Sequence, residues 1–217
     1  MKIAIPIFDR VTALDAIGPY EVLSRLPGAE LKFVGFEAGP VKTDNRMLSL
    51  NAEVALEDFA EPDILVFPGG FGTRALMKDE RMLDWVRHVH ERSDWTTSVC
   101  TGSLVLGAAG LLRGLEATTH WASLHVLEQL GAAPTKRRVV EQGKIVTAAG
   151  VSSGIDMALR LAGHVAGDQV AQAIQLGIEY DPQPPYDSGS PDKASPDVIA
   201  LVRRAEEAEA RAAAAAA

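Results

Sequence analysis

The sequence predicts an α/β fold in which a doubly wound, mostly parallel β-sheet lies between two layers of helices. Three observations predict this class. Short segments rich in Val, Ile and Phe alternate with segments of helical character along most of the chain. These short segments are continuously apolar, as burial under helices on both faces requires. The length of 217 residues suits one hydrophobic core, so we expect a single domain over residues 1–217.

The individual elements follow from this alternation. The predicted parallel strands are residues 2–8, 31–36, 63–70, 96–100 and 144–150. The predicted helices are residues 13–26, 79–93, 101–112, 152–167 and 168–180, with a further Ala-rich and Glu-rich helix from Pro196. Turn residues and apolar alternation over 39–59 indicate a small antiparallel excursion, and the Pro-rich stretch 181–191 is expected to be a loop.

Composition and charge narrow the function classes. Apolar residues make up 47% and charged residues 23% of the chain, which is typical of soluble globular proteins. A formal charge of -8 argues against nucleic acid as a partner, and residues 136–138 form the only short basic run. No apolar run is long enough to span a membrane, so we expect no membrane insertion. One cysteine and no signal-like N-terminus predict a cytoplasmic protein without an intrachain disulfide.

The only cysteine, Cys100, lies where a predicted strand gives way to a predicted helix, in the stretch T-T-S-V-C-T-G-S. Small residues follow it, and Gly102 would let another part of the backbone pass closely, as in a nucleophile elbow. The amide groups of the following helix favour a thiolate, so we expect the pKa of Cys100 to fall below about 8.5. A lone cysteine is otherwise a small buried apolar residue, which is the structural alternative.

A second strand end supplies candidate anion donors. The stretch D-I-L-V-F-P-G-G, residues 63–70, ends in Gly69 and Gly70, whose backbone could approach a developing negative charge closely. We expect the N–H groups of Gly70 and Thr101 to be the donors. A tight turn after the strand is the alternative.

Asp15 lies after the first predicted strand, in V-T-A-L-D-A-I-G-P-Y-E-V-L. Proline favours the first turn of a helix, so Pro19 predicts that Asp15 lies in the loop just before that helix, at the carboxyl end of a strand. If its surroundings bring its pKa toward neutrality, Asp15 can exchange protons with a substrate that Cys100 attacks. A capping role is the alternative for Asp15, and Glu21, the competing acid, is expected to be solvated.

These motifs together resemble the ThiJ/PfpI superfamily over nearly the whole chain. The motifs that carry the resemblance are L-D-A-I-G-P-Y-E-V-L, F-P-G-G, S-V-C-T-G-S-L-V-L-G-A-A-G-L-L, A-T-T-H-W, S-S-G-I-D-M-A-L and Y-D-P-Q-P-P-Y-D-S-G-S-P. The resemblance implies a three-layer sandwich like that of class I glutamine amidotransferases and flavodoxins. It also implies that Cys100 is the nucleophile, Asp15 the acid and base, and Thr101 their neighbour at the elbow. Gly150 and Val151 are then placed near the active site.

Within the superfamily, the pattern is most similar to the branch that hydrates isocyanides, because that branch carries aspartate where many members carry glutamate. The implied reaction converts R–N≡C to R–NH–CHO through a covalent thioimidate, with no metal and no organic cofactor. Asp15 would act first as acid and then as base. Ile17, Trp121, Val151 and Tyr186 are candidate walls of a small apolar substrate pocket. The resemblance also implies a homodimer.

Two other functions remain open on the sequence. A glyoxalase, a deglycase-like enzyme or a peptidase would use the same thiolate on a carbonyl, although peptidase-like members usually have histidine where Thr101 stands. A ligand-sensing domain related to AraC-type regulators is the non-enzymatic alternative. We expect a helix-turn-helix module after such a domain, and only about twenty residues follow Pro196. His120 could form a dyad with Cys100, but we expect it to be a cap or a hydrogen-bonded core residue.

Overall fold

The computed structural model describes residues 1–215, and the chain divides into two compact units, Met1–Glu179 and Tyr180–Ala217. The first unit contains a seven-stranded sheet in the order β10-β11-β7-β6-β1-β2-β5. All neighbouring strands are parallel except β10, which is antiparallel to β11. The strands are β1 (Lys2–Pro6), β2 (Glu30–Gly35), β5 (Val54–Ala55), β6 (Ile64–Phe67), β7 (Trp95–Val99), β10 (Val139–Gln142) and β11 (Ile145–Ala148).

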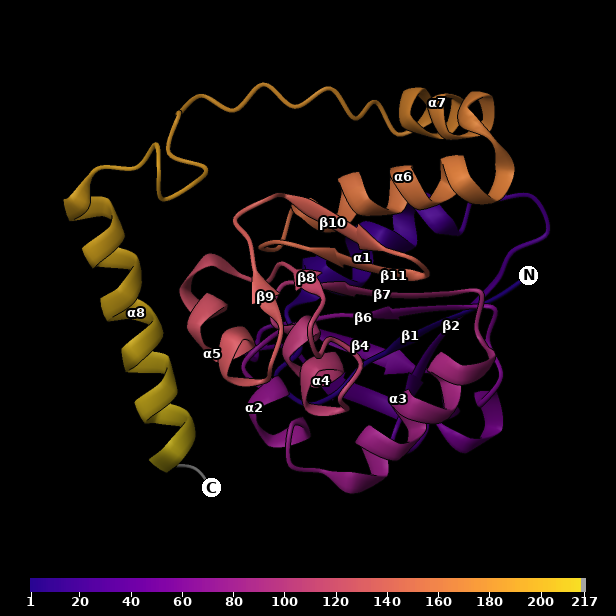
Figure 1. Cartoon of the computed structure of the whole chain (residues 1–217), viewed down its shortest axis with the longest axis horizontal. Helices are drawn as coiled ribbons and strands as arrows, with labels where there is room; N and C mark the ends of the chain where they lie inside the picture. The colour runs from indigo at the N-terminus through magenta and orange to yellow at the C-terminus, as the bar shows by residue number, and fades with distance from the viewer. Residues whose placement is uncertain (216–217) are drawn as a thin grey trace. The chain divides into compact units, whose positions relative to one another are not determined.

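Helices cover both faces of this sheet, which confirms the predicted fold class (Figure 1). Helices α1 and α6 lie over one face, and α2, α3 and α4 lie over the other. The helices of the first unit are α1 (Ala13–Leu23), α2 (Thr73–Leu76), α3 (Glu80–Arg92), α4 (Gly102–Ala108), α5 (Leu124–Gln129), α6 (Ser153–Ala166) and α7 (Asp168–Gly177), with two 3₁₀ turns, Glu57–Phe59 and Trp121–Ser123.

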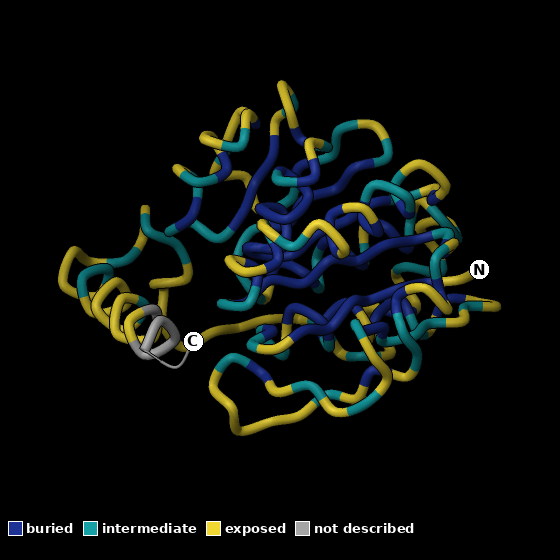
Figure 2. Tube along the Cα trace, turned by 90° about the horizontal axis from the view of Figure 1, so that it is seen from below, coloured by how far each residue is buried: buried dark blue, intermediate teal, exposed yellow. Residues whose placement is uncertain are grey.

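The central strands are buried, as their continuous apolar character predicted. Every residue of β6 and β11 is buried, and Figure 2 shows buried strands inside a shell of more exposed helices and loops. Phe67 at the end of β6 is fully buried, and the Trp85 indole on α3 donates to the Leu56 carbonyl at 2.9 Å. The strands that end at the candidate site are therefore fixed by packing in the core.

The antiparallel excursion predicted for residues 39–59 is a hairpin of β3 (Gly39–Lys42) and β4 (Ser49–Ala52). Its loop touches the segment after β1 through a bridge between Val11 and Thr43. A second short pair, β8 (Glu116–Ala117) with β9 (Ala133–Pro134), was not predicted because two-residue strands show no periodicity.

Helix α1 begins at Ala13, as the helical pattern predicted, but ends at Leu23 rather than at residue 26. Asp15 therefore lies in its first turn and not in the loop before it, and Pro19 lies inside the helix. Proline costs a helix one hydrogen bond, and here burial of this face of α1 outweighs that cost. Helix α4 ends at Ala108, and Gly110 follows in the left-handed region at φ 88°, as is common after a helix C-terminus.

The second unit begins with residues 180–195, which form turns and bends without regular secondary structure, as the Pro-rich composition predicted. Helix α8 (Pro196–Ala215) follows. No helix among the described residues combines the length and the apolar character that crossing a membrane would need. The single domain over residues 1–217 stays a prediction.

Candidate active site

The candidate site lies at the edge of the sheet where β1, β6, β7 and β11 end. These four strands are parallel neighbours, so the loops that follow them emerge on the same side. The chain runs outward from β1 to β2 and β5, then returns to β6 and runs outward the other way to β7 and β11. The strand order therefore reverses between β1 and β6, which is where ligands bind in open α/β sheets.

Cys100 stands on a strained turn between β7 and α4. Its φ of 55° is in the left-handed region, which is uncommon for a residue other than glycine. Its N–H donates to the carbonyls of Ala148 and Ala149 at 3.1 and 2.9 Å. Its own carbonyl accepts from Thr119 Oγ1 at 2.9 Å and Ser103 Oγ at 3.2 Å. These bonds hold the backbone in the strained conformation that the elbow motif requires.

Glycine is required two positions after Cys100. A Cβ atom on Gly102 would lie 2.1 Å from the Phe67 carbonyl oxygen at the end of β6. The close passage of backbone that the sequence indicated is therefore present, and it brings the elbow against the neighbouring strand.

The sulfur of Cys100 lies in a nearly closed environment, with the residue 5% exposed. Burial raises the pKa of Cys100 well above its ordinary value, and the nearby Asp15 charge raises it further. The backbone N–H groups of Val151 and Thr101 lower this pKa, but by less. The expectation of a lowered pKa is therefore wrong, because desolvation outweighs the peptide groups that face the sulfur.

Asp15 is fully buried beside the thiol. Its Oδ2 accepts from the Gly69 N–H at 2.9 Å, whereas its Oδ1 has no hydrogen-bond partner among the described residues. Burial raises the pKa of Asp15 to about 7, although the Gly69 N–H and the Cys100 thiol each lower it and the charge of Asp44 raises it. Near neutral pH the Cys100 thiol therefore keeps its proton, while the Asp15 carboxyl group gains and loses one.

The loop of Gly69 and Gly70 has a different role from the one predicted. The Gly69 N–H is taken by Asp15, and the Gly70 N–H donates to Thr101 Oγ1 at 2.9 Å. Of the two expected donors, the Gly70 N–H is therefore engaged within the protein, whereas the Thr101 N–H faces the sulfur. An anion site at this loop stays a prediction. A Cβ on Gly69 would lie 2.6 Å from Thr101 N and 2.8 Å from Asp15 Oδ2. The loop holds the carboxylate and the elbow together.

Thr101 fastens this loop through its hydroxyl group. Besides accepting from Gly70, it lies 3.2 Å from Thr73 Oγ1, whose hydroxyl also donates to the Gly70 carbonyl at 2.7 Å. The side chain of Thr101 is thus engaged in holding the loop, while its backbone N–H faces the sulfur. The role of Thr101 lies in its position rather than in a reactive hydroxyl.

The predicted pocket walls differ in how far they are exposed. Ile17, Trp121, Gly150 and Val151 are half-buried. Val151 follows β11 with φ 26°, an outlier for a β-branched residue, and its N–H faces the sulfur. The sequence placed Val151 near the site, but not this N–H, because a positive φ at valine has no sequence signal. Tyr186 belongs to the second unit and is 80% exposed, so its place in the pocket stays a prediction.

His120 lies close to the site without replacing Asp15. A Cβ on Gly150 would lie 2.9 Å from His120 Cδ2, so the imidazole packs on the backbone that leads to Val151. Its ring centroid is 5.6 Å from that of Trp121. Burial, and then the charge of Arg74, lower the pKa of His120. An uncharged imidazole cannot stabilise a thiolate by charge, which disfavours a Cys–His ion pair.

The sequence missed residues that support the site from elsewhere in the chain. Thr119, from A-T-T-H-W, and Ser103 fix the Cys100 carbonyl, and Asp44 from the β3–β4 hairpin acts on Asp15. Thr119 is 1% exposed. A buried hydroxyl needs a hydrogen-bond partner, so the two threonines of A-T-T-H-W were a usable signal.

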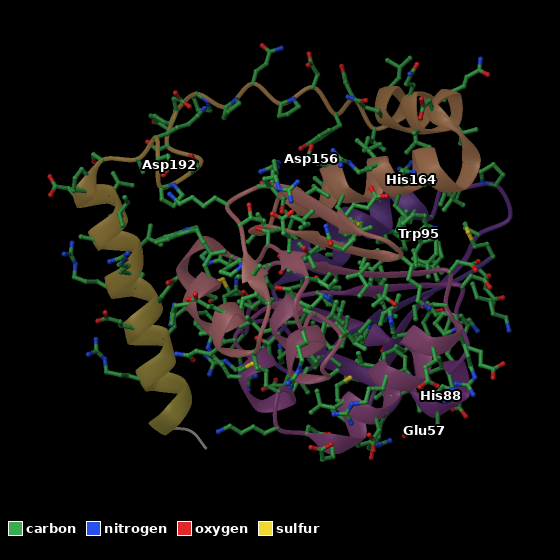
Figure 3. The ribbon with its side chains drawn as sticks, viewed as in Figure 1. Glu57, His88, Trp95, Asp156, His164 and Asp192 are labelled. Carbon is green, nitrogen blue, oxygen red and sulfur yellow. The ribbon has the colours of Figure 1, made fainter. Side chains whose placement is uncertain are left out.

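Histidines outside the site have structural contacts. The rings of Trp95 and His164, labelled in Figure 3, stack at a centroid distance of 5.2 Å, and His164 Nε2 lies 3.1 Å from Glu141. His90 bonds Thr96 Oγ1 at 2.8 Å. Within residues 1–215, no three His, Cys, Asp or Glu side chains gather as a metal site would require.

Comparisons of sequence and of structure identify relatives of this chain. Residues 1–163 match the model of the DJ-1/PfpI family. The chain is 46% identical to an isonitrile hydratase of Pseudomonas putida over 204 residues, which are 94% of this chain and 89% of that protein. The crystal structure of a ThiJ/PfpI family protein from Pseudomonas syringae has a TM-score of 0.91 and 35% sequence identity, covering 97% of this chain and 89% of that one.

A regulator is among the more distant relatives. The HTH-type transcriptional regulator CdhR of Pseudomonas aeruginosa is 28% identical over 180 residues. The alignment covers 81% of this chain but 52% of the regulator. This chain therefore resembles about half of that protein.

Proposed function

The chain belongs to the DJ-1/PfpI family, and from this membership and its buried Cys100–Asp15 pair we propose that it hydrates isocyanides to N-substituted formamides. The membership confirms the resemblance that the sequence motifs indicated. The observation that carries the proposal is the pair itself: a thiol beside a carboxyl group whose pKa is about 7. The similarity to an isonitrile hydratase over 94% of the chain supports the choice of substrate.

The first step adds the thiol across the terminal carbon of the isocyanide. Asp15, as carboxylate, takes the proton from Cys100, and the sulfur forms a bond to carbon. Asp15 then returns this proton to the same carbon, which gives the thioimidate R–N=CH–S–Cys100. The proton that the carbon gains is the one the thiol lost. A pKa near 7 lets one carboxyl group take and return it within a narrow pH range.

The second step adds water to the thioimidate. Asp15, again a carboxylate, removes a proton from water as the water oxygen attacks the carbon, and it passes this proton to the nitrogen as the C=N double bond becomes single. The adduct R–NH–CH(OH)–S–Cys100 then collapses: Asp15 removes the hydroxyl proton, the C=O bond forms and the C–S bond breaks, which releases R–NH–CHO. Asp15 returns this last proton to the sulfur. The sum is R–N≡C plus water to R–NH–CHO, with the enzyme unchanged.

Limited access to the sulfur suits this substrate. Cys100 is 5% exposed, and an isocyanide presents its reactive carbon at the tip of a linear C–N–R unit. Only this tip needs to reach the sulfur, while the organic group stays among the half-buried side chains of Ile17, Trp121 and Val151.

The proposal is tested by mixing the purified protein with an aromatic isocyanide and following formamide formation by absorbance. We expect turnover by the wild type and its loss in Cys100→Ala and Asp15→Asn. His120→Asn is the matched control and should keep most of the activity, because its imidazole is not required for the proton transfers. Mass spectrometry of rapidly quenched wild type should show Cys100 carrying the added mass of the isocyanide.

Three outcomes would overturn the proposal. If the wild type is inert toward isocyanides and consumes methylglyoxal, an aldehyde-directed activity replaces it. If Cys100→Ala retains full activity, the covalent step is wrong. If His120→Asn is as inactive as Cys100→Ala, a Cys–His dyad performs the chemistry.

The proposal also covers the oligomeric state of the enzyme and its location in the cell. We propose that it acts as a homodimer, which rests on the resemblance to the superfamily, and that it acts in the cytoplasm, which suits a chain with a single cysteine. Light scattering coupled to size-exclusion chromatography measures the assembly: a mass near 46 kDa, twice the 23.1 kDa of one chain, is expected. A mass near 23.1 kDa would contradict it.

A further inference from the structure

A closed set of hydrogen bonds joins Asp15 to the loop of the β3–β4 hairpin. Thr12 precedes α1, and its N–H donates to the Gly69 carbonyl at 2.9 Å. The Gly69 N–H donates to Asp15 Oδ2 at 2.9 Å, and the Asp15 N–H donates to the Thr12 carbonyl at 3.1 Å. The Thr12 hydroxyl donates to Asp44 Oδ2 at 2.8 Å. One residue, Thr12, is therefore hydrogen-bonded both to the Asp15 backbone and to the Asp44 carboxylate.

From this arrangement we propose that Asp44 is a positioning residue for the hydration reaction: it keeps Asp15 basic enough to take the proton of a buried thiol. The inference rests on the proposed function for the choice of reaction, but the effect on the Cys100–Asp15 pair exists without any isocyanide. Asp44 touches neither the sulfur nor a substrate in this scheme, and it acts through Asp15.

The hairpin loop fixes Asp44 in place. Its N–H donates to the Val11 carbonyl at 2.9 Å, and its Oδ1 accepts from the Asn45 N–H at 2.7 Å. The Arg10 N–H donates to the Lys42 carbonyl at 2.8 Å, so the hairpin is held on both sides of its bridge to Val11. Asp44 is half-buried and cannot swing away without breaking the bond to Thr12.

The charge of Asp44 is not neutralised by its neighbours. The nearby Arg46 forms an ion pair with Asp9, and no cation forms an ion pair with Asp44 among the residues that the structure describes. The charged and titratable groups that act on Asp15 are then Cys100 from the elbow and Asp44 from the hairpin, while the β6 loop contributes the uncharged Gly69 N–H. A fixed negative charge nearby makes a carboxylate hold its proton more tightly.

This effect matters because the Cys100 thiol, whose pKa is raised by burial, must give its proton to a carboxylate of lower pKa. Burial raises the pKa of the Cys100 thiol well above its ordinary value, so a weakly basic carboxylate would take its proton slowly. The Gly69 N–H makes Asp15 less basic, and the Asp44 charge opposes that effect. Asp44 therefore keeps the two proton affinities of the pair closer together.

The test compares Asp44→Asn with the wild type in two assays across pH 5 to 10. The first is kcat/KM for hydration of an aromatic isocyanide, and the second is the rate of Cys100 alkylation by iodoacetamide. In Asp44→Asn we expect the acid limb of both profiles to move to lower pH by roughly half a pH unit, because one like charge that acts on Asp15 is removed. We expect kcat at the optimum to fall roughly 2- to 5-fold, because Asp15 has become a weaker base.

Matched variants separate the charge from the fold. Asp44→Glu keeps the charge, so its acid limb should lie close to that of the wild type. Asp58→Asn removes an exposed carboxylate elsewhere on the chain and should leave both profiles in place. Thr12→Val keeps the Asp44 charge but removes the hydroxyl that holds it, and it should move the acid limb in the same direction by less. If Asp44→Asn does not fold, Thr12→Val carries the test.

Two results would overturn the inference. The first is that the acid limbs of Asp44→Asn coincide with those of Asp58→Asn. The second is that the acid limbs of Asp44→Glu are shifted as far as those of Asp44→Asn. The alkylation assay also separates this failure from failure of the proposed function. If the wild type does not turn over isocyanides but the alkylation profile of Asp44→Asn shifts, the proposed reaction is wrong and the role of Asp44 stands.

Discussion

The buried carboxyl group of Asp15 should cost the folded protein stability at neutral and alkaline pH, and Asp15→Asn should remove that cost. In the unfolded chain the group ionises with its ordinary pKa of 3.8, whereas in the folded state its pKa is about 7. Below pH 3.8 the group is protonated in both states. As the pH rises from there through 7, the unfolded chain loses the proton first, so the free energy of unfolding decreases. Above pH 7 the cost stays constant.

The size of this effect follows from the two pKa values. Each pKa unit corresponds to about 1.36 kcal/mol, so a difference of about three units gives a full cost of about 4 kcal/mol above pH 7. At pH 5 only about 2 kcal/mol of this cost is present, because the pH lies little more than one unit above 3.8. Asparagine keeps the shape and an oxygen for the Gly69 N–H but carries no charge. The stability advantage of Asp15→Asn should therefore grow by about 2 to 3 kcal/mol from pH 5 to pH 8.

Urea unfolding followed by tryptophan fluorescence measures this difference, since all three tryptophans lie in the first unit. The wild type and Asp15→Asn are unfolded at pH 5, 6, 7 and 8, and the free energies are compared at each pH. For Asp58→Asn, which removes an exposed carboxylate, the plot of unfolding free energy against pH should be parallel to that of the wild type. If the curves of the wild type and Asp15→Asn are also parallel, Asp15 does not carry a raised pKa and the proton transfers proposed for it lose their basis.

Three further substitutions test the geometry of the site. Gly69→Ala should reduce kcat/KM at least 100-fold and lower the unfolding temperature in a thermal melt, because its Cβ would lie 2.8 Å from Asp15 Oδ2 and 2.6 Å from the neighbouring backbone nitrogen; wild-type behaviour would contradict the close approach. Thr101→Val should destabilise the protein by about 1 to 3 kcal/mol in urea unfolding, since it leaves the buried Gly70 N–H without its acceptor. Thr119→Val should cost about 1 kcal/mol and also slow Cys100 alkylation, because the elbow loses a bond to its carbonyl; an unchanged alkylation rate would show that Ser103 alone holds the turn.

The sheet was predictable because the feature that identifies it is local. A run such as I-L-V-F in β6 is continuously apolar, and burial on both faces is the physical reason for that composition. The order of strands and helices then restricts the parallel arrangement, and with it the edge at which β1, β6 and β7 end. The positions of Cys100, Asp15 and Gly69 at that edge followed from chain order alone.

The details of the site were not predictable because they depend on contacts between distant segments. The bond from the Gly69 N–H to Asp15 joins residues 54 positions apart, and nothing local in either segment specifies it. The same holds for Asp44, which reaches the site only because the hairpin folds back onto Val11. The direction of the pKa shift of Cys100 was predicted wrongly for the same reason: the helix that follows the thiol is visible in sequence, while the extent of its burial is not.

Several residues that break local rules lie at the site. Cys100 and Val151 both take a positive φ that their side chains disfavour, Pro19 lies inside a helix, and Asp15 is a buried acid with one oxygen lacking a partner among the described residues. Each of these features costs stability, and Val151 and Asp15 both act directly on the sulfur of Cys100. Strain at a folded site persists only when the surrounding core holds it in place, and the fully buried strands β6 and β11 that flank β7 supply that support. In the proposed mechanism, a thiol whose pKa is raised by burial depends on a neighbouring base, and this need would account for the costly carboxyl group beside it.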